Sequence, residues 1–346
     1  HDFSDDRAVS RLKALAERPH DLTAPDGLSA ERIAALRASS CGFDLLYATQ
    51  RVNDEVLDAL QALADEAGLV ETFRAMKGGA VLNRIDGFDS ENRQMLHTAS
   101  RDVFTEPPAA PEASARARAE LDKLRAFLKD LNRGRLVNAQ GQPFTTMVQV
   151  GIGGSDLGPR ALYLALKAHA VEGRSARFIA NVDPDDAAEV LQGLDLSRTL
   201  VNIVSKSGTT LETLTNERLV CAALEKAGLD PARHLLAVTG EGSPMDDPSR
   251  YLASFYMFDS IGGRYSATSM VGAVTLGFAL GMEAVLDILR GAHQMDLAVE
   301  HPDIRHPLPL LMPLRGILYH NFLGSRTVAI PPYSQDSSRN TTYIHK

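Results

Sequence analysis

The 346-residue chain has few cysteines, no tryptophan, no long apolar run and no excess of basic residues. Cys41 and Cys221 are its only cysteines, so we expect a reducing, cytoplasmic compartment and no disulfide framework. The longest apolar stretch, residues 270–282, is too short for a membrane span and predicts a buried helix. The formal net charge of −8 argues against binding to nucleic acid or to an anionic membrane. Local groups must therefore capture any bound anion.

The first hundred residues have the pattern of helices. Apolar residues at helical spacing between Val56 and Ala64 predict one helix, with Asn53 as its N-cap and Gly68 at its end. The proline-rich residues 105–111 break the periodicity and predict a linker. A charged helix with leucines at 121, 124, 128 and 131 follows and stops at Gly134. We expect a helical N-terminal region over residues 1–110.

From Thr145 onward, short apolar runs alternate with segments long enough for a helix. The runs predict strands at residues 147–150, 178–182, 200–204 and 234–238. Such alternation predicts βαβ units, and so an α/β fold with a parallel sheet flanked by helices. Ligands of these sheets bind beyond the carboxyl ends of the strands, which is where three polar or glycine-rich motifs follow.

The first motif is the glycine-rich loop at residues 151–159. Glycines allow a close approach to an anion, and the helix start that follows carries partial positive charge. The loop nearly matches a dinucleotide fingerprint, with Asp183 as a candidate ribose-binding acid. However, Asp156 occupies the third glycine position, where its carboxylate would oppose a pyrophosphate. A plain tight turn with no ligand is a further alternative.

The second motif places four hydroxyls and an ammonium directly after a buried strand, at Ser205, Lys206, Ser207, Gly208, Thr209 and Thr210. Hydroxyls together with N-terminal amides can surround a phosphate dianion, to which the lysine adds charge. The alternative is a capping box between Thr209 and Glu212, which would explain Glu212 but not the other polar groups. The sequence contains no Walker pattern, which argues against a nucleotide triphosphatase.

The third motif is Gly262-Gly263-Arg264-Tyr265-Ser266. An arginine held by a glycine turn at a strand end suits a developing oxyanion, although a surface salt bridge would use the same residue. The ten histidines form no metal-ligand pattern, so we expect no metal site among them. We expect His97 to have an ordinary core, cap or surface role.

Together, residues 151–155, 205–213 and 262–266 resemble the three motifs of the glucose-6-phosphate isomerase (phosphoglucose isomerase) family, in the family's order. Ser207 stands where many members have threonine, and Gly208 where others have phenylalanine. The resemblance covers nearly the whole chain and includes residues 51–56, 94–99, 291–293 and 330–335.

The resemblance implies that glucose 6-phosphate and fructose 6-phosphate are interconverted through a cis-enediol(ate), without a cofactor, in a homodimer. Gly154 and Ser155 would touch the sugar phosphate, Ser205 through Thr210 would hold its phosphate group, and Arg264 would stabilise the intermediate. A first sugar-isomerase domain would cover residues 111–290. A second would begin at 291–335 and be largely absent, with a tail at 336–346.

The family motifs that carry the proton-transferring glutamate and the ring-opening histidine do not occur in this sequence. The sequence after Gln335 resembles the family's extreme C-terminus, so we expect that a long segment is omitted at the Gln335–Asp336 junction. If that omission is real, we expect no isomerase activity. Two alternatives therefore stay open: a sugar-phosphate-binding module without chemistry, and a nucleotide-dependent oxidoreductase.

Overall fold

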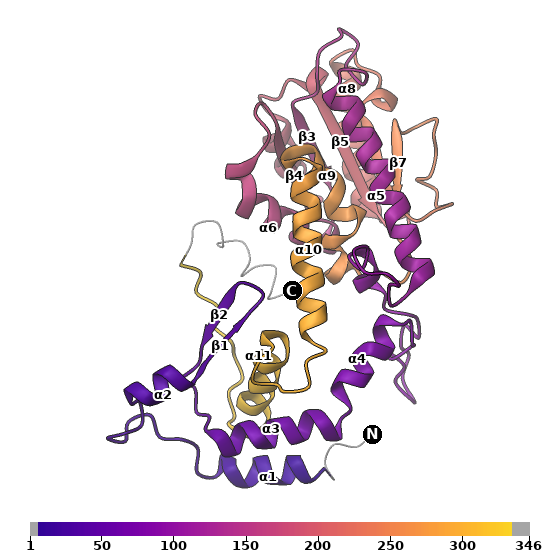
Figure 1. Ribbon diagram of the computed structural model, residues 1–346. Coiled ribbons are helices and arrows are strands. Elements are labelled where there is room, and N and C mark those ends of the chain that lie inside the picture. Colours follow the sequence, from indigo (N-terminus) through magenta and orange to yellow (C-terminus); the bar gives the residue numbers. More distant parts are fainter. Residues whose placement is uncertain (1–5, 334–346) are drawn as a thin grey trace. The chain divides into compact units, whose positions relative to one another are not determined.

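The computed structural model describes residues 6–333, which belong to two compact units (Figure 1). Residues 6–80 and 291–329 form unit 1, and residues 81–290 and 330–333 belong to unit 2. These units differ from the predicted ranges 1–110, 111–290 and 291–335. Residues 81–110 join the sheet unit, where the Leu96 N–H donates to the Ser260 carbonyl over 3.0 Å.

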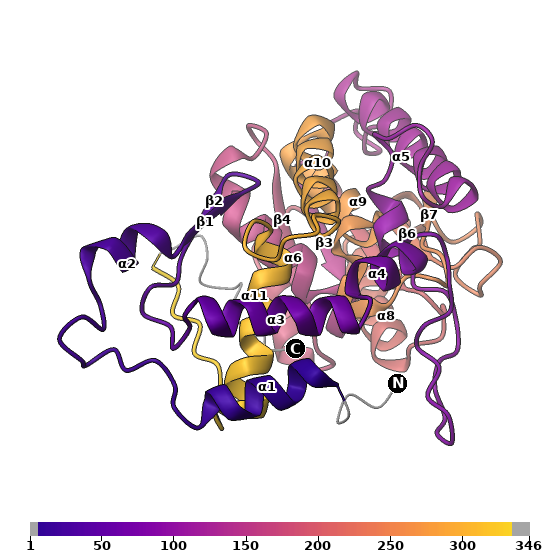
Figure 2. The ribbon, with the colours of Figure 1, turned by 60° about the horizontal axis from the view of Figure 1, so that its bottom comes forward.

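Unit 1 is mainly helical. Its helices α1 and α3 lie side by side (Figure 1 and Figure 2), and their apolar faces share a core with α11. The predicted helix with its Asn53 cap is confirmed, because the Asn53 side chain accepts the Val56 N–H at 3.0 Å. Its helical elements are α1 (Arg7–Ala16), α2 (Ala30–Ala35), α3 (Asp54–Glu66), α4 (Leu69–Lys77), α11 (Leu308–Ile317) and the π-helical turn η8 (Leu318–Phe322).

Unit 1 also holds an antiparallel hairpin of β1 (Arg37–Ser40) and β2 (Phe43–Leu46). Cys41 and Gly42 form its turn with φ values of 52° and 82°, the left-handed backbone that a two-residue hairpin turn requires. Helical periodicity does not predict this hairpin. Its strands are short and mostly exposed, and cysteine is not a usual residue at a positive φ.

Unit 2 is built on a five-stranded parallel sheet in the order β4-β3-β5-β6-β7. Its strands are β3 (Thr146–Val150), β4 (Ser175–Ile179), β5 (Thr199–Ser205), β6 (Leu235–Thr239) and β7 (Ala253–Tyr256). The α/β fold with a parallel sheet is confirmed, and so are the four predicted strands. The second strand ends at Ile179, earlier than predicted, because Asn181 turns the chain by accepting the Asp183 N–H at 2.7 Å.

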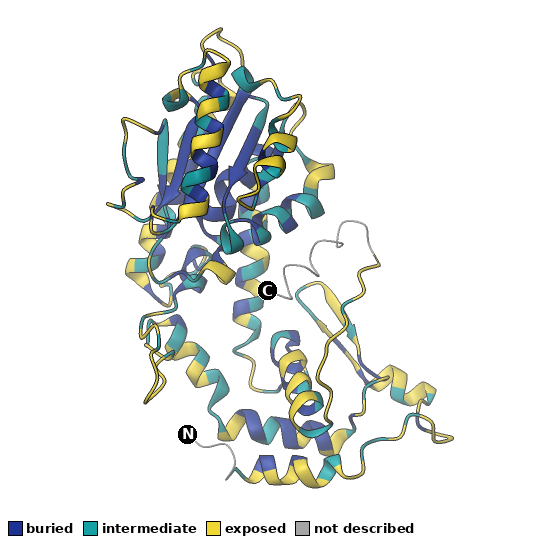
Figure 3. Cartoon of the chain, turned by 180° about the vertical axis from the view of Figure 1, so that it is seen from behind, coloured by how far each residue is buried: buried dark blue, intermediate teal, exposed yellow. Residues whose placement is uncertain are grey.

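Helices cover both faces of this sheet, whose strands are mostly buried (Figure 3). Alternate strand residues point to opposite faces and build two cores. One core joins the sheet to α5, α6, α9 and α10, and the other joins it to α7 and α8. These helices are α5 (Pro111–Asn132), α6 (Leu157–Leu166), α7 (Pro184–Leu191), α8 (Leu211–Lys226), α9 (Met270–Leu280) and α10 (Met282–Ala298), the last of which ends in unit 1. The 3-10 segments are η2 (His97–Ser100), η3 (Gly153–Ser155), η4 (Lys167–His169), η5 (Leu196–Arg198), η6 (Pro231–Arg233) and η7 (Gly263–Thr268).

The predicted buried helix is α9, in which every residue is buried. Gly281, at a φ of 92°, ends it and separates it from α10. Within residues 6–333, no helix combines the length and the apolarity that a membrane span would need.

The strand order also contains a topological switch point. The chain leaves β3 for β4 on one side and then returns to β5 on the other side of β3. In open parallel sheets, ligands bind beyond the carboxyl ends of the strands at such a switch point. The fold therefore directs attention to the loops that follow β3 and β5.

Candidate functional site

The glycine-rich loop and the hydroxyl-rich loop follow neighbouring strands. Residues 151–156 come directly after β3, and residues 206–210 come directly after β5. Because β3 and β5 pair in parallel, with Val150 opposite Ile203, both loops leave the same edge of the sheet. The structure thus brings together two of the three sequence motifs at the switch point.

The third motif packs closely against the backbone of the first. A Cβ atom on Gly154 would lie only 2.1 Å from the carbonyl oxygen of Gly263, so only glycine allows this approach. The Ser266 hydroxyl donates to the Gly263 carbonyl at 2.7 Å and also lies 3.3 Å from that of Gly154. The loop after β3 and the turn that carries Arg264 are therefore one packed element.

The hydroxyl-rich loop is held together by its own side chains. The Ser205 and Thr210 hydroxyls lie 2.9 Å apart, and Thr209 donates both its N–H and its hydroxyl to Ser207 Oγ, at 3.2 and 2.9 Å. Gly208 has a φ of 67°, and a Cβ atom there would lie 2.9 Å from Ser243 Oγ. The loop is thus preorganised, with its hydroxyls gathered before the first turn of α8.

The capping-box alternative for this loop is wrong. The N-cap residue of α8 is Thr210, one residue later than that box requires, and no side chain caps the helix. Thr209 instead uses its hydroxyl within the loop, on Ser207. Glu212 is exposed in the first turn, where a carboxylate favours the helix dipole.

Lys206 points away from the hydroxyls. Its ammonium donates to the main-chain carbonyls of Asp259 and Ile261, both at 3.2 Å, and lies 3.4 Å from the Asp259 carboxylate. The lysine thereby ties the loop after β5 to the segment that leads into the Gly262–Ser266 turn. The third motif thus packs on the first motif, and the segment directly before it is tied to the second.

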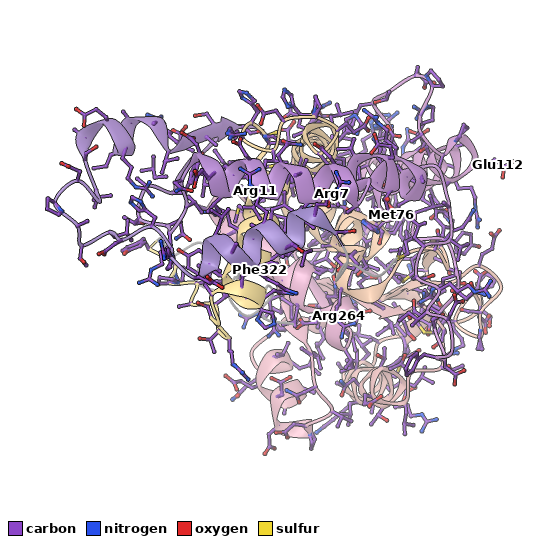
Figure 4. All side chains as sticks on the ribbon, turned by 90° about the horizontal axis from the view of Figure 1, so that it is seen from below. Arg7, Arg11, Met76, Glu112, Arg264 and Phe322 are labelled. Atoms are coloured by element: carbon purple, nitrogen blue, oxygen red, sulfur yellow. The ribbon has the colours of Figure 1, made fainter. Side chains whose placement is uncertain are left out.

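Arg264 lies exposed at the start of η7, where Figure 4 labels it. Its neighbour Tyr265 stacks on His97 of η2, with ring centroids 5.0 Å apart and an interplanar angle of 24°. Sequence reasoning gave His97 no role at the site. The only available signal was its place in residues 94–99, one of the stretches that resemble the family.

Two further polar residues support the loops and were not predicted. Gln149 of β3 is fully buried and donates to the Ser155 carbonyl at 2.6 Å. Thr239 of β6 is equally buried and donates to the Ser205 carbonyl at 2.7 Å. A polar residue inside an otherwise apolar strand is the signal that could have found both of them.

The two acids that were weighed for and against a dinucleotide have other contacts. The Asp183 carboxylate accepts the Asp185 N–H at 3.0 Å and caps α7. Asp156 is buried under the first loop and forms an ion pair with Arg160. Both acids thus have structural functions. Among the described residues, no group of three or more histidine, cysteine, aspartate or glutamate side chains is placed to hold a metal ion.

Comparison with known proteins agrees with this geometry. The family model described as phosphoglucose isomerase matches residues 46–346. The glucose-6-phosphate isomerase of Desulfotalea psychrophila is 56% identical over 340 residues, which are 98% of this chain and 64% of that protein. That of Chlamydia caviae is 50% identical over 335 residues, 96% of this chain and 62% of the relative.

A solved structure extends the likeness to three dimensions. The crystal structure of a glucose-6-phosphate isomerase from Chlamydia trachomatis superposes with a TM-score of 0.94 at 45% identity, covering 99% of this chain and 65% of that one. This chain thus spans about two thirds of the length of its relatives. The predicted Gln335–Asp336 junction lies outside the described residues. Because the family model matches most of its length, the chain belongs to the phosphoglucose isomerase family.

Proposed function

We propose that the loops at the ends of β3 and β5 bind a hexose 6-phosphate, and that the protein interconverts glucose 6-phosphate and fructose 6-phosphate. The observation that carries this proposal is the set of contacts that links the three loops. Gly154 packs on Gly263, and Lys206 reaches Ile261 just before the Arg264 turn, which supports placing the hydroxyl cluster and Arg264 in one site. Family membership supports the choice of substrate.

The phosphate group would lie among the hydroxyls of Ser205, Ser207, Thr209 and Thr210. Hydroxyl donors rotate to suit an acceptor, and α8, which starts at Leu211, adds the partial positive charge of its N-terminus. Gly154 and Ser155, in the adjoining loop, would contact the sugar phosphate from the β3 side. These groups bind a dianion without requiring a basic surface, in keeping with the net charge of −8.

Arg264 would act on the sugar itself. When a base removes the proton next to the carbonyl of the open-chain sugar, negative charge develops on the carbonyl oxygen. A fixed guanidinium beside that oxygen lowers the barrier, because it stabilises the enediolate more than the ground state. The resemblance assigns the base and the ring-opening acid to motifs that this sequence does not contain, so the residues of this chain supply binding and charge stabilisation.

A titration tests the binding proposal. We expect glucose 6-phosphate to bind saturably by calorimetry and glucose not to bind. Thr210→Val should weaken the binding by about tenfold or more, since hydrogen bonds to charged groups are worth roughly 1.5–3 kcal/mol. Thr215→Val is the matched control, because that hydroxyl bonds only the Leu211 carbonyl one turn into the helix, at 2.8 Å. Equal binding of glucose and its phosphate would contradict the proposal.

The second candidate is a sugar-phosphate-binding module without chemistry, which the absent base motif favours. A coupled assay on glucose 6-phosphate distinguishes the two. Turnover that falls in Arg264→Met supports the isomerase, whereas saturable binding without turnover supports the module. The homodimer and the cytoplasmic location implied by the resemblance remain parts of the isomerase proposal, which family membership supports.

A further inference from the structure

The side chain of Lys206 has an unusual set of partners for a residue in a phosphate-binding loop. Its ammonium carries three N–H donors. It donates to the carbonyls of Asp259 and Ile261, at 3.2 Å each, and also forms an ion pair with the Asp259 carboxylate, at 3.4 Å. All of these partners lie in one segment, residues 259–261. A phosphate bound by this ammonium would have to compete with them.

The two carbonyls matter more than the carboxylate. The Asp259 side chain is 82% exposed and is shared with Arg93 at 3.2 Å, so its ion pair with Lys206 contributes little. The two carbonyls, in contrast, belong to the main chain, so hydrogen bonds to them constrain the backbone itself. The ammonium therefore holds the backbone of residues 259–261 in place and does more than pair with a surface charge.

The carbonyls that Lys206 binds lie next to the turn that carries Arg264. Two consecutive glycines, 262 and 263, separate Ile261 from Arg264, and glycine leaves the backbone free unless contacts hold it. Lys206 holds the beginning of the turn, and the Ser266 hydroxyl holds its Gly263 carbonyl at 2.7 Å. The position of Arg264 thus depends on contacts at both sides.

We propose that the Lys206 side chain is a positioning residue that links the hydroxyl-rich loop to the Gly262–Arg264 turn, and that it is not a phosphate ligand. This inference rests on the proposed sugar-phosphate site. It replaces the sequence-based expectation that the ammonium adds charge at the phosphate. In this proposal the Lys206 side chain holds two parts of the site at a fixed distance. One is the hydroxyl-rich loop, which would bind the phosphate dianion, and the other is the Gly262–Arg264 turn, which would stabilise the enediolate.

Three probes separate the two roles in calorimetric titrations of the full chain. Inorganic phosphate reports on the hydroxyl loop alone. Glucitol 6-phosphate adds a neutral C1, and 6-phosphogluconate adds a carboxylate at C1, which imitates the charge that Arg264 would stabilise. Arg264→Met serves as the reference variant. It shows how far the preference for 6-phosphogluconate over glucitol 6-phosphate falls when the guanidinium is removed.

We expect Lys206→Met to retain phosphate binding and to lower the preference for 6-phosphogluconate over glucitol 6-phosphate by about fivefold or more, as for a weakened charge-assisted contact. Asp259→Asn keeps both carbonyls and should leave the preference unchanged. Two results for Lys206→Met would overturn the inference. One is a loss of affinity for inorganic phosphate as large as the loss for 6-phosphogluconate, and the other is an unchanged affinity for both of these probes. If the unaltered chain binds none of the three probes, it is the proposed function that fails.

Hydrogen–deuterium exchange gives a readout that needs no ligand. Lys206→Met should speed amide exchange in residues 259–266 and leave exchange at the start of α8 as it is. Unchanged exchange in residues 259–266 refutes the positioning role, even if the variant binds every probe poorly. Circular dichroism verifies that the variant is folded.

Discussion

Gly154→Ala tests whether the packing of the first and third motifs builds the site. The added Cβ would lie 2.1 Å from the Gly263 carbonyl oxygen and 2.3 Å from its carbonyl carbon. An ordinary contact distance of about 3.5 Å requires a movement of about 1.4 Å, and both partners are backbone rather than flexible side chain. Overpacking of this kind costs about 1–3 kcal/mol.

Gly262→Ala, in the turn on which Gly154 packs, is the matched control. Its Cβ would lie 3.8 Å from the Tyr265 ring, an ordinary contact, and neither glycine has a positive φ. Both substitutions gain about 0.4–1 kcal/mol from a stiffer unfolded chain. We therefore expect Gly262→Ala to be neutral or slightly stabilising and Gly154→Ala to lose roughly 1–2 kcal/mol of unfolding free energy.

Urea unfolding measures this difference. The chain has no tryptophan, so far-ultraviolet circular dichroism is the suitable signal. With a slope of roughly 2 kcal/mol/M, the midpoint of Gly154→Ala should fall by about 0.5–1 M. Its preference for 6-phosphogluconate should fall as well, because Gly263 must move and Arg264 moves with it. Equal midpoints and equal preferences in the two variants would refute the packing argument.

Three further predictions concern other parts of the chain. Burial, together with nearby Glu217 and Glu225, raises the pKa of the Cys221 thiol to about 11. Its alkylation at pH 8, followed by peptide mass spectrometry, should therefore be roughly a hundredfold slower than that of a free thiol and should accelerate as the pH rises towards that pKa. Asn53→Ala should cost about 1 kcal/mol in urea unfolding by removing the α3 cap, whereas Asn53→Asp should cost little. Tyr251→Phe removes a 2.7 Å hydrogen bond to the buried Glu217 and should cost about 1–3 kcal/mol, well above the cost of the less buried Tyr256→Phe.

The elements that could be predicted from the sequence are those that depend on neighbours in the chain. The α3 cap needs only Asn53 and an amide three residues on, and β5 is a run of consecutive buried residues. The β1–β2 hairpin could not be predicted, because the first positive-φ position of its turn is held by Cys41 rather than by one of the usual residues. The end of β4 was misplaced because an asparagine turn, rather than the end of the apolar run, stops the strand.

At the site, too, the sequence predicts local features but not contacts between distant residues. Its three motifs could be recognised, since each is a short segment with an unusual composition. Their mutual contacts could not, because Lys206 meets Ile261 across 55 positions and Ser266 meets Gly154 across 112. Composition suggested that Lys206 is a phosphate ligand, whereas its partners in the structure support a positioning role.

The division of charge at the site follows from these contacts. Asp259 lies against the Lys206 ammonium, and the hydroxyl loop itself carries no other cation. In the proposed site, the loop would hold a phosphate with dipoles, through hydroxyls and the N-terminus of α8. Arg264 is the cation of the adjoining turn. In the proposed reaction its guanidinium would act on the charge that forms only in the transition state, which is where electrostatic stabilisation raises the rate.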